Sequence, residues 1–292
     1  MKAGYVPALG TPLDKKGNFC VESFKKQIED QINAGAVGLL CMGSMGIQAC
    51  IRQEVYPQVA KAAVEAAAGR VPVFVGAMDT SIARAKDRMA AMEDLDIAGF
   101  VFTAPYYAPC NRNQMMNYFK EVAASTRHSI LLYDLPGVTQ SKITYDMVLE
   151  MLRVVPNFAG IKSADLQMFR KLTLNPDVPK EFIMVYSGLD TFDIAYKWGV
   201  NKCLDGMCSC TPVNTGKMFK AMEQGDYETA AECLNKIVAL RDAFLGWDLW
   251  PAYSTAMNLL GYEGEHGLDY SDPINPEYVP KIREILQKIG EL

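Results

Sequence analysis

The segment Asn157-Phe158-Ala159-Gly160-Ile161-Lys162-Ser163-Ala164-Asp165 is a short apolar run that ends in a single lysine. The run is too short for a helix and is typical of a strand buried on both faces, with a helix cap predicted at 163–165. Burial at the end of such a strand is expected to lower the pKa of Lys162 below the free value of about 10.4. An amine tuned in this way can attack a ketone and form a Schiff base. The alternative, which this segment alone favours, is a lysine whose ammonium group reaches water.

The composition limits the class of protein. The chain has 292 residues, half of them hydrophobic, and a formal net charge of −5. This length supports one large domain, with or without an appendage. The mild acidity and the absence of a long basic run argue against a nucleic-acid partner. Charged residues interrupt every apolar stretch before it reaches the length of a membrane span. Without a signal peptide, the expected location is the cytoplasm.

The cysteines and histidines bear on redox state and on metal binding. Eight cysteines are scattered along the chain, and without a secretory signal reduced thiols are expected. Cys208 and Cys210 form the one close pair, and His128 and His266 are far apart in sequence. A structural zinc site or a histidine-rich catalytic metal site is therefore not expected, although carboxylates could still hold a cation.

Strand-like apolar runs alternate with amphipathic helical runs along most of the chain. The strands are expected at 5–9, 37–41, 71–75, 100–102, 130–133, 158–162, 183–186 and 202–204. The helices that follow them are expected at 23–34, 52–68, 81–92, 113–124, 145–154, 166–174, 190–198 and 213–223. Eight such units predict a parallel (β/α)8 TIM barrel. A doubly wound sheet is the competing architecture, but no Gly-x-Gly-x-x-Gly turn follows the first strand.

The end of the chain departs from this alternation. Three helices are expected at 227–243, 252–260 and 277–289, with no strand between them. We therefore divide the chain into a barrel domain, 1–224, and a C-terminal helical extension, 225–292. The extension is suited to cover the barrel or to help subunits associate.

In such barrels the chemistry lies at the carboxyl ends of the strands and in the loops that follow. A lysine, several phenols and a glycine turn would then meet at one mouth, which moves the interpretation of Lys162 towards catalysis. The segments selected by this rule are Gly43-Ser44-Met45-Gly46, Pro105-Tyr106-Tyr107, Tyr133-Asp134-Leu135-Pro136, Lys162, Ser187-Gly188-Leu189-Asp190 and Asp205-Gly206.

Each of these segments has a functional and a structural interpretation. The turn 43–46 would present backbone N–H groups to an anion at the start of a helix, or is an ordinary tight turn. Tyr133 would carry protons in a Schiff-base reaction, or lines the barrel. The segment Pro105-Tyr106-Tyr107 would place a phenol at the pocket or at a subunit contact, or packs as aromatic surface. Asp190 would bind substrate hydroxyls or cap a helix. Asp205 would be a costly buried charge unless it is functional or paired.

In this order, from Val6-Pro7-Ala8-Leu9-Gly10-Thr11-Pro12 to the C-terminal helices, the elements resemble the dihydrodipicolinate synthase and N-acetylneuraminate lyase superfamily of class I aldolases. The turn 43–46 matches the family's glycine–hydroxyl–hydroxyl–glycine turn, which holds the substrate carboxylate. Tyr133-Asp134-Leu135-Pro136 resembles its Tyr-Asn-x-Pro motif, whose tyrosine shuttles protons. Gly160-Ile161-Lys162 matches the Gly-x-Lys of the Schiff-base lysine. Pro105-Tyr106-Tyr107 matches a segment whose second tyrosine reaches a neighbouring active site in the synthases.

The chain departs from the family's pattern around the substrate carboxylates. Met45 replaces a hydroxyl residue, so one side-chain bond to the carboxylate is lost while the backbone N–H remains. Ile47 stands where a glutamate is usual, and Asp134 replaces the usual asparagine. Val138 occupies the position of an arginine that binds the aldehyde carboxylate in the synthases, and nothing nearby in the sequence offers an equivalent bidentate donor.

Further departures lie at the last two strands. Asp205 stands where small or hydroxyl residues are usual. Gly188-Leu189-Asp190 is similar to the lyases' Gly-x-Asp, which holds sugar-acid hydroxyls, but Thr191 follows where the lyases place glutamate. The pocket therefore resembles neither a standard synthase nor a standard sialic acid lyase.

The leading hypothesis is a Schiff-base-forming class I aldolase or lyase that makes or breaks a carbon–carbon bond of a 2-oxo acid. Pyruvate would be the common fragment, and the substrate would be sugar-acid-like, either N-acetylneuraminate lyase-like or a 2-keto-3-deoxy acid. Lys162 would form the imine and Tyr133 would act as acid and base, with Ser44 linking Tyr133 to Tyr107 as a proton relay. The backbone of Ser44 and Met45 would bind the carboxylate. The other expected substrate-binding positions are Asp134, Val138, Gly188, Asp190 and Asp205.

Three alternatives remain open. The nearest is dihydrodipicolinate synthase itself, and another is a dehydratase that acts on a deoxy-oxo sugar acid through the same lysine. The third is a non-catalytic relative that binds a small oxo acid, which Met45, Ile47 and Asp134 keep open. The resemblance implies no metal or organic cofactor, because the imine acts as the electron sink, and it implies a homo-tetramer or dimer.

Overall fold

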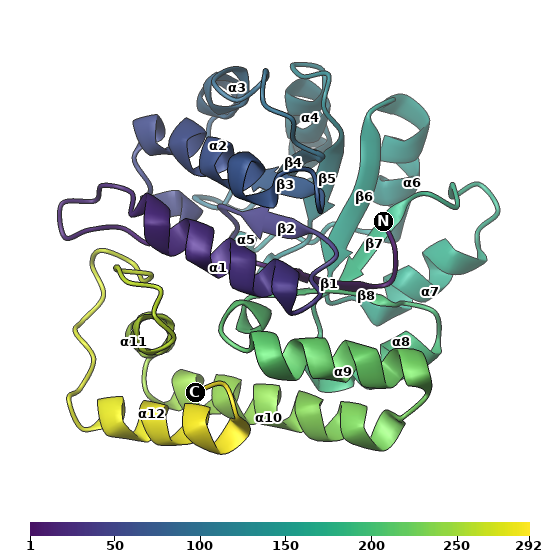
Figure 1. The fold of residues 1–292 in the computed structure, drawn as a ribbon. Helices are drawn as coiled ribbons and strands as arrows, with labels where there is room; N and C mark the ends of the chain where they lie inside the picture. The colour runs from purple at the N-terminus through teal and green to yellow at the C-terminus, as the bar shows by residue number, and fades with distance from the viewer.

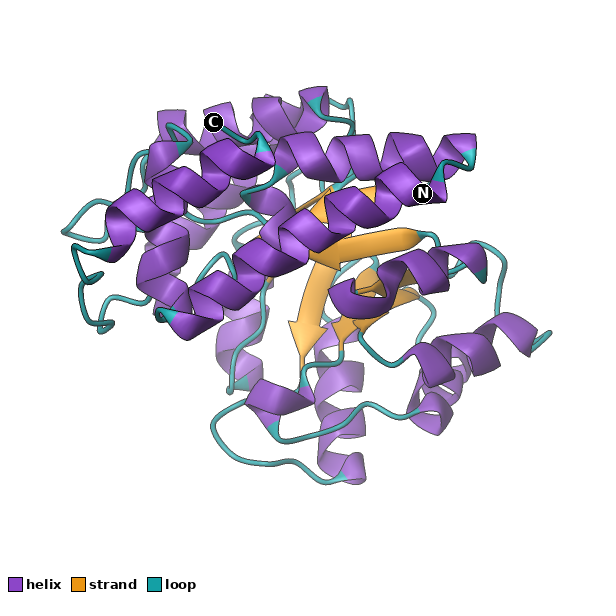
Figure 2. Ribbon diagram, turned by 90° about the horizontal axis from the view of Figure 1, so that it is seen from below, coloured by secondary structure: helices purple, strands orange, loops and turns teal.

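The computed structural model describes all 292 residues. Eight parallel strands form the centre and helices surround them (Figures 1 and 2). No helix combines the length and the apolar character that a membrane crossing requires. The strands are β1 (Gly4–Pro7), β2 (Leu39–Cys41), β3 (Val73–Gly76), β4 (Gly99–Thr103), β5 (Ile130–Tyr133), β6 (Phe158–Ser163), β7 (Ile183–Tyr186) and β8 (Lys202–Asp205).

The strands follow one another in sequence order around a single sheet from β2 to β8, and β1 pairs with β8. Two backbone hydrogen bonds join β1 to the β2 side: Val37 N–H donates to the Tyr5 carbonyl and Leu9 N–H to the Leu40 carbonyl, both at 2.9 Å. The sheet is therefore a nearly closed (β/α)8 barrel. This observation confirms the predicted fold class.

Nearly every helix lies within a few residues of its expected position. The α-helices of the barrel are α1 (Val21–Asn33), α2 (Tyr56–Ala67), α3 (Ile82–Ala90), α4 (Arg112–Ala123), α5 (Pro136–Thr139), α6 (Tyr145–Val154), α7 (Leu166–Leu174), α8 (Phe192–Lys197) and α9 (Pro212–Gln224). The 3-10 helices are η1 (Gln48–Cys50), η2 (Gln53–Val55), η3 (Leu189–Thr191) and η4 (Met207–Ser209).

The one-turn helix α5 is not among the helices expected from the sequence. Pro136 occupies its first turn, where the fixed φ of proline suits a helix and the missing N–H is not needed. At the end of β6, Asp165 caps α7 as predicted, since its carboxylate accepts a hydrogen bond from the Met168 N–H at 2.8 Å.

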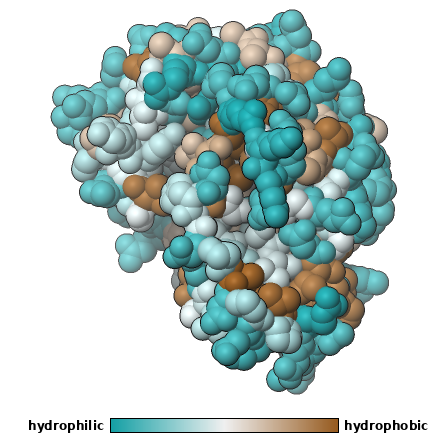
Figure 3. Space-filling view, turned by 90° about the vertical axis from the view of Figure 1, so that its left-hand side faces the viewer, coloured by the Kyte–Doolittle hydropathy of each residue, from teal (hydrophilic) through white to brown (hydrophobic).

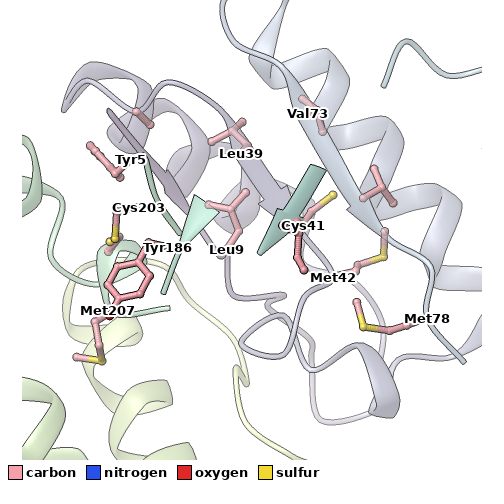
Figure 4. Packing of buried hydrophobic residues seen from close by; sticks show 14 of the residues in the cluster. Tyr5, Leu9, Leu39, Cys41, Met42, Val73, Met78, Tyr186, Cys203 and Met207 are labelled. Carbon is pink, nitrogen blue, oxygen red and sulfur yellow. The ribbon is translucent and has the colours of Figure 1, made fainter. Parts of the chain in front are cut away.

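The alternation of side chains along the strands separates two apolar clusters. On β5, Leu131 and Tyr133 face the inside of the barrel, whereas Ile130 and Leu132 face the helices. Figure 4 shows part of the outer cluster, with Tyr186, Cys203 and Met207 gathered on one side of Leu9 and Cys41 and Met42 on the other. The inner cluster comprises Val6, Ala8, Val37, Leu40, Phe74, Val101, Leu131, Tyr133, Val185 and Leu204.

The C-terminal helices form a layer against one side of the barrel (Figure 1). Helix α10 packs along α9 and also contacts α8 and η3, while α11 and α12 pack against each other and against α10. Phe244 of α10 belongs to the same buried cluster as Phe219 of α9 and Tyr5 of β1, so the layer shares its core with the barrel. The helices of this layer are α10 (Tyr227–Gly246), α11 (Leu249–Leu259) and α12 (Tyr278–Ile289).

Candidate active site

Lys162 and Tyr133 lie side by side at the carboxyl ends of β6 and β5. The two residues are register partners in the parallel ladder. Both side chains point into the barrel, and the Lys162 Nζ lies 3.6 Å from the centre of the Tyr133 ring. Only 7% of the Lys162 surface is exposed. The strand pairing therefore places a buried amine against a phenol, as the sequence predicted for these two positions.

Two of the carboxylates near this pair form ion pairs with other residues. Asp165 forms an ion pair with Lys142 at 3.1 Å, and Asp190 pairs with Arg241 at 2.7 Å. None of the salt bridges in the chain includes Lys162. Its amine is consequently held by packing and by the tyrosine ring, and no carboxylate forms an ion pair with it.

Asp134 lies directly after Tyr133 but on the opposite side of the strand. Its buried carboxylate accepts hydrogen bonds from the Ser163 hydroxyl at 2.8 Å and from the Ile143 N–H at 3.0 Å, and it forms an ion pair with Lys142. Both of its oxygens are therefore used by the protein. The structure gives Asp134 an anchoring role behind the Tyr133–Lys162 pair, rather than the substrate contact that was expected.

The turn at residues 43–46 has an unusual backbone. Met42 and Ile47, which bracket it, both adopt left-handed conformations, with φ of 54° and 47°. Gly46 is required by close approach, since a Cβ there would lie 2.9 Å from the Met42 backbone. The buried Thr11 hydroxyl anchors the turn by donating to the Gly46 carbonyl at 2.8 Å. Left-handed non-glycine residues cost energy and are concentrated at functional sites, so this turn is a pre-formed feature.

The backbone N–H groups of Ser44 and Met45 make no hydrogen bond within the protein, so they are free to bind an anion. The expectation that this turn opens a helix was wrong, however. The short η1 follows it, and α2 begins only at Tyr56, so no long helix directs its dipole at the turn. The Met45 side chain packs against Gly206. This contact connects the turn after β2 with the loop after β8.

Asp205 ends β8 and is half-buried at the same mouth. One of its oxygens accepts a hydrogen bond from the Met207 N–H at 2.9 Å, and no salt bridge reaches it. Burial raises the pKa of the Asp205 carboxyl, while the nearby charges of Lys162 and Arg241 oppose that rise. The second oxygen makes no hydrogen bond with the protein and can accept one from a bound molecule.

Asp190 lies in η3 after β7, and it does not cap a helix as one interpretation proposed. Its carboxylate receives a two-pronged contact from Arg241 of α10, with Oδ2 2.7 Å from Nη1 and Oδ1 2.7 Å from Nη2. This contact holds the pKa of Asp190 below its ordinary value. Gly188 lies two residues before Asp190, and the Tyr186 phenol fills the space that a side chain at Gly188 would need.

Arg241 is a residue of the site that the sequence analysis missed. The analysis found no bidentate cation close to Val138 in sequence, whereas the structure brings one to the mouth from the C-terminal layer. A signal was present, because Ile237 and Phe244, four residues before and three after, are buried on the same face of α10. A charged residue on the buried stripe of a helix usually has a specific partner.

Two expected site residues are not brought into this group within one chain. Tyr107 is 92% exposed, and Val138 of α5 is 56% exposed. No hydrogen bond joins Ser44, Tyr133 and Tyr107 within the chain, so the proton relay stays a prediction that a neighbouring subunit would have to complete.

A cleft of about 920 Å3 lies elsewhere, between the loop 13–17, α11 and residues 265–274. Figure 3 views the molecule from that side, where hydrophilic side chains predominate. The cleft contains none of the expected site residues. No three His, Cys, Asp or Glu side chains lie together in a way that could hold a metal ion, and all eight cysteines are free thiols.

Comparison with known proteins agrees with this geometry. A model of the Dihydrodipicolinate synthetase family matches residues 1–289. The chain is 30% identical over 244 residues to the 4-hydroxy-tetrahydrodipicolinate synthase of Pseudoalteromonas atlantica, with 83% of each chain covered.

Two solved structures are similar in fold. The Proteus mirabilis N-acetylneuraminate lyase has a TM-score of 0.89 at 19% identity, covering 100% of this chain and 99% of the lyase chain. The prophage protein YagE of E. coli K12, solved in complex with pyruvate, has a TM-score of 0.88 at 21% identity, with 99% of each chain covered. The chain belongs to the dihydrodipicolinate synthetase family. It is a class I aldolase, a carbon–carbon lyase.

Proposed function

We propose, from this family membership, that the protein is a Schiff-base aldolase that makes or cleaves a carbon–carbon bond of a 2-oxo acid, with pyruvate as the common fragment. The observation that carries the proposal is the placement of Lys162 beside Tyr133. A buried amine without a carboxylate partner, 3.6 Å from the centre of a phenol ring, combines a nucleophile with an acid–base group.

Cleavage would begin with attack of the neutral Lys162 amine on the C2 carbonyl of the oxo acid. The C2 oxygen leaves as water, and the nitrogen remains as a protonated imine. Tyr133 would take the proton of the C4 hydroxyl, so that the C3–C4 bond breaks and its electron pair moves into the imine. An aldehyde leaves and an enamine remains. Protonation at C3 and hydrolysis of the imine then release pyruvate and restore the lysine.

The carboxylate next to C2 would bind at the turn after β2. The free N–H groups of Ser44 and Met45 offer two donors on a backbone whose conformation is already set. Met45 offers no side-chain donor, so the backbone would bind this carboxylate without the second hydroxyl that is usual in the family.

The other end of the substrate would face Asp205 and Asp190. Both are hydrogen-bond acceptors when ionised, and hydroxyl groups are the neutral donors that suit them. We therefore propose a hydroxylated, sugar-acid-like substrate.

A second candidate is 4-hydroxy-tetrahydrodipicolinate synthesis, which the name of the relative at 30% identity favours. That reaction joins pyruvate to aspartate semialdehyde, whose carboxylate needs a cationic partner. Val138 offers none, and Arg241 is occupied by Asp190. Steady condensation of pyruvate with aspartate semialdehyde would establish this candidate over the first.

The first experiment is to incubate the protein with pyruvate, reduce it with borohydride, and determine its mass intact and after digestion. The proposal expects a pyruvyl adduct on Lys162. A folded protein with no adduct would reject pyruvate as the substrate. Aldehydes with hydroxyl or carboxyl groups would then be compared as partners in condensation.

We further propose that the protein acts as a homo-oligomer, because Tyr107 projects into solvent beside the barrel mouth. In an oligomer this phenol would reach the site of a neighbouring subunit and meet Ser44 and Tyr133. Sedimentation of the wild type and of Tyr107→Ala tests this. A monomeric wild type with full activity would reject it.

A further inference from the structure

The C-terminal layer reaches the barrel mouth through one side chain. Arg241 extends from α10 to the loop after β7, and 23% of its side chain is exposed. It forms four hydrogen bonds to two carboxylates. Two of them go to Asp190 at 2.7 Å each, and the other two go to Asp242 at 2.9 and 2.7 Å.

This arrangement leaves Arg241 without capacity for another anion. Four of its five N–H donors already have acceptors, and the group formed with Asp190 and Asp242 carries a net negative charge. The group lies at the carboxyl end of the barrel, where Lys162 also lies, because Asp190 is in η3, directly after β7, and α10 packs against η3. The net negative charge of this group would repel an anionic end of a substrate. A neutral end with hydroxyl groups could instead donate hydrogen bonds to the carboxylates of the group.

We propose that Arg241 is a positioning residue for substrate specificity. It holds the Asp190 carboxylate in one orientation, so that Asp190 selects a neutral, hydroxylated aldehyde over a carboxylated one. Because 64% of the Asp190 side chain is exposed, it would otherwise sample several rotamers. The two-pronged contact removes that freedom before the substrate arrives, which is how pre-organisation improves binding. This inference rests on the proposed aldolase function.

The test compares Arg241→Met, Arg241→Lys, Asp190→Asn and the double variant Arg241→Met/Asp190→Asn with the wild type. The assay is condensation of pyruvate with glyceraldehyde, which is neutral and hydroxylated, and with succinic semialdehyde, which carries a carboxylate. Borohydride trapping with pyruvate alone is run on every variant. Arg283→Met is the matched control, because Arg283 is an exposed arginine of α12 in the same layer.

The wild type is expected to prefer glyceraldehyde. Arg241→Met and Asp190→Asn should each raise the KM for glyceraldehyde about tenfold, and the double variant should raise it by the same factor, because the two residues act as one unit. Arg241→Lys should show a smaller rise, since an ammonium group cannot form the two-pronged contact. Pyruvyl adduct formation should be unchanged in all of them, and Arg283→Met should match the wild type.

Several outcomes would overturn the inference alone, provided that the adduct forms. These are an unchanged KM in Arg241→Met, additive losses in the double variant, or a loss confined to succinic semialdehyde, which would show that Arg241 binds an anion directly. An adduct without any turnover of glyceraldehyde would also overturn it. Absence of the adduct in the wild type would instead reject the proposed function, and the inference with it.

Discussion

The two halves of the barrel mouth are built differently. At β5 and β6, Tyr133 and Lys162 are neighbours in the strand register, buried and without ionic partners. At β7 and β8, Asp190 and Asp205 lie in loops or at a strand end, and a helix of the C-terminal layer supplies the cation that holds Asp190. In the first half both side chains are buried, and the pairing of β5 with β6 positions them. The second is charged, more exposed and positioned by side chains.

This difference suggests that the two halves have different roles. Backbone pairing in the middle of a sheet holds atoms more rigidly than exposed side chains do, which suits groups that must meet a reacting carbon. A charged group assembled from separate elements can change its preference through single substitutions, which suits recognition of the variable end of a substrate.

The largest effect is expected from Lys162→Ala. Loss of the nucleophile should abolish the pyruvyl adduct and lower kcat/KM by about 10^4-fold or more. Lys202→Ala is the control, because Lys202 is also a partly buried strand lysine, at the opposite end of β8. If a pyruvyl adduct still forms on another lysine in this variant, the imine chemistry does not take place at the β5–β6 half.

Tyr133→Phe should separate proton transfer from imine formation. The ring that packs against Lys162 is kept, so the adduct should still form, while kcat should fall by about 10^2- to 10^4-fold without the hydroxyl. Stopped-flow turnover and adduct trapping measure the two steps. Tyr227→Phe, on the surface of α10, should have no effect. A fall in kcat below tenfold would show that another group moves the proton.

Asp134→Ala should destabilise the protein by about 2–3 kcal/mol. The change would leave the Ser163 hydroxyl and the Ile143 N–H without their acceptor behind Tyr133 and Lys162. Urea unfolding measures the loss. Asp94→Ala is the matched control, because the Asp94 side chain is fully exposed and meets only Arg127, at 3.7 Å. Equal stability of the two variants would show that this half needs no side-chain anchor.

Asp205→Asn should stabilise the protein at neutral pH by on the order of 1 kcal/mol. Because the folded-state pKa of Asp205 is raised, the folded state binds its proton more tightly than the unfolded state does. Its contribution to stability is therefore lost as the pH rises from the unfolded pKa, about 3.9, through the folded value.

The gain from Asp205→Asn should accordingly disappear at pH values below about 3.9. Thermal unfolding of both proteins across this range gives the difference. A gain that does not depend on pH would mean that burial does not destabilise the ionised Asp205 carboxylate. In that case the β7–β8 half would not hold a destabilised charge.

The smallest effect is expected on the stability of Arg241→Met. The pair with Asp190 is partly exposed, and such pairs contribute about 0–1 kcal/mol, so the unfolding free energy should change by less than about 1 kcal/mol. The same urea titration, repeated at high salt, measures this. A larger loss of unfolding free energy would show that Arg241 stabilises the fold. The substrate specificity could then not be changed at this position without destabilising the protein.

Much of the fold, and the pairing of two residues of the candidate site, could be predicted from the sequence, because their causes are local. The alternation of strands and helices predicted the barrel, and the ends of β5 and β6 identified Tyr133 and Lys162. The same alternation could have shown that Asp134, one residue after Tyr133, faces away from the barrel interior. The turn at 43–46 was predicted, but the 3-10 helices η1 and η2 follow it, and α2 begins only at Tyr56.

The sequence by itself determined the strand ends, and through them the amine and the phenol, since residues in paired strands have neighbours set by chain order. Only the tertiary structure decided the partner of Asp190, because Arg241 lies 51 residues further along and on a helix outside the eight repeated units. That contact depends on how α10 docks against η3. A docking angle between two elements follows from many packed side chains at once, which no local pattern records.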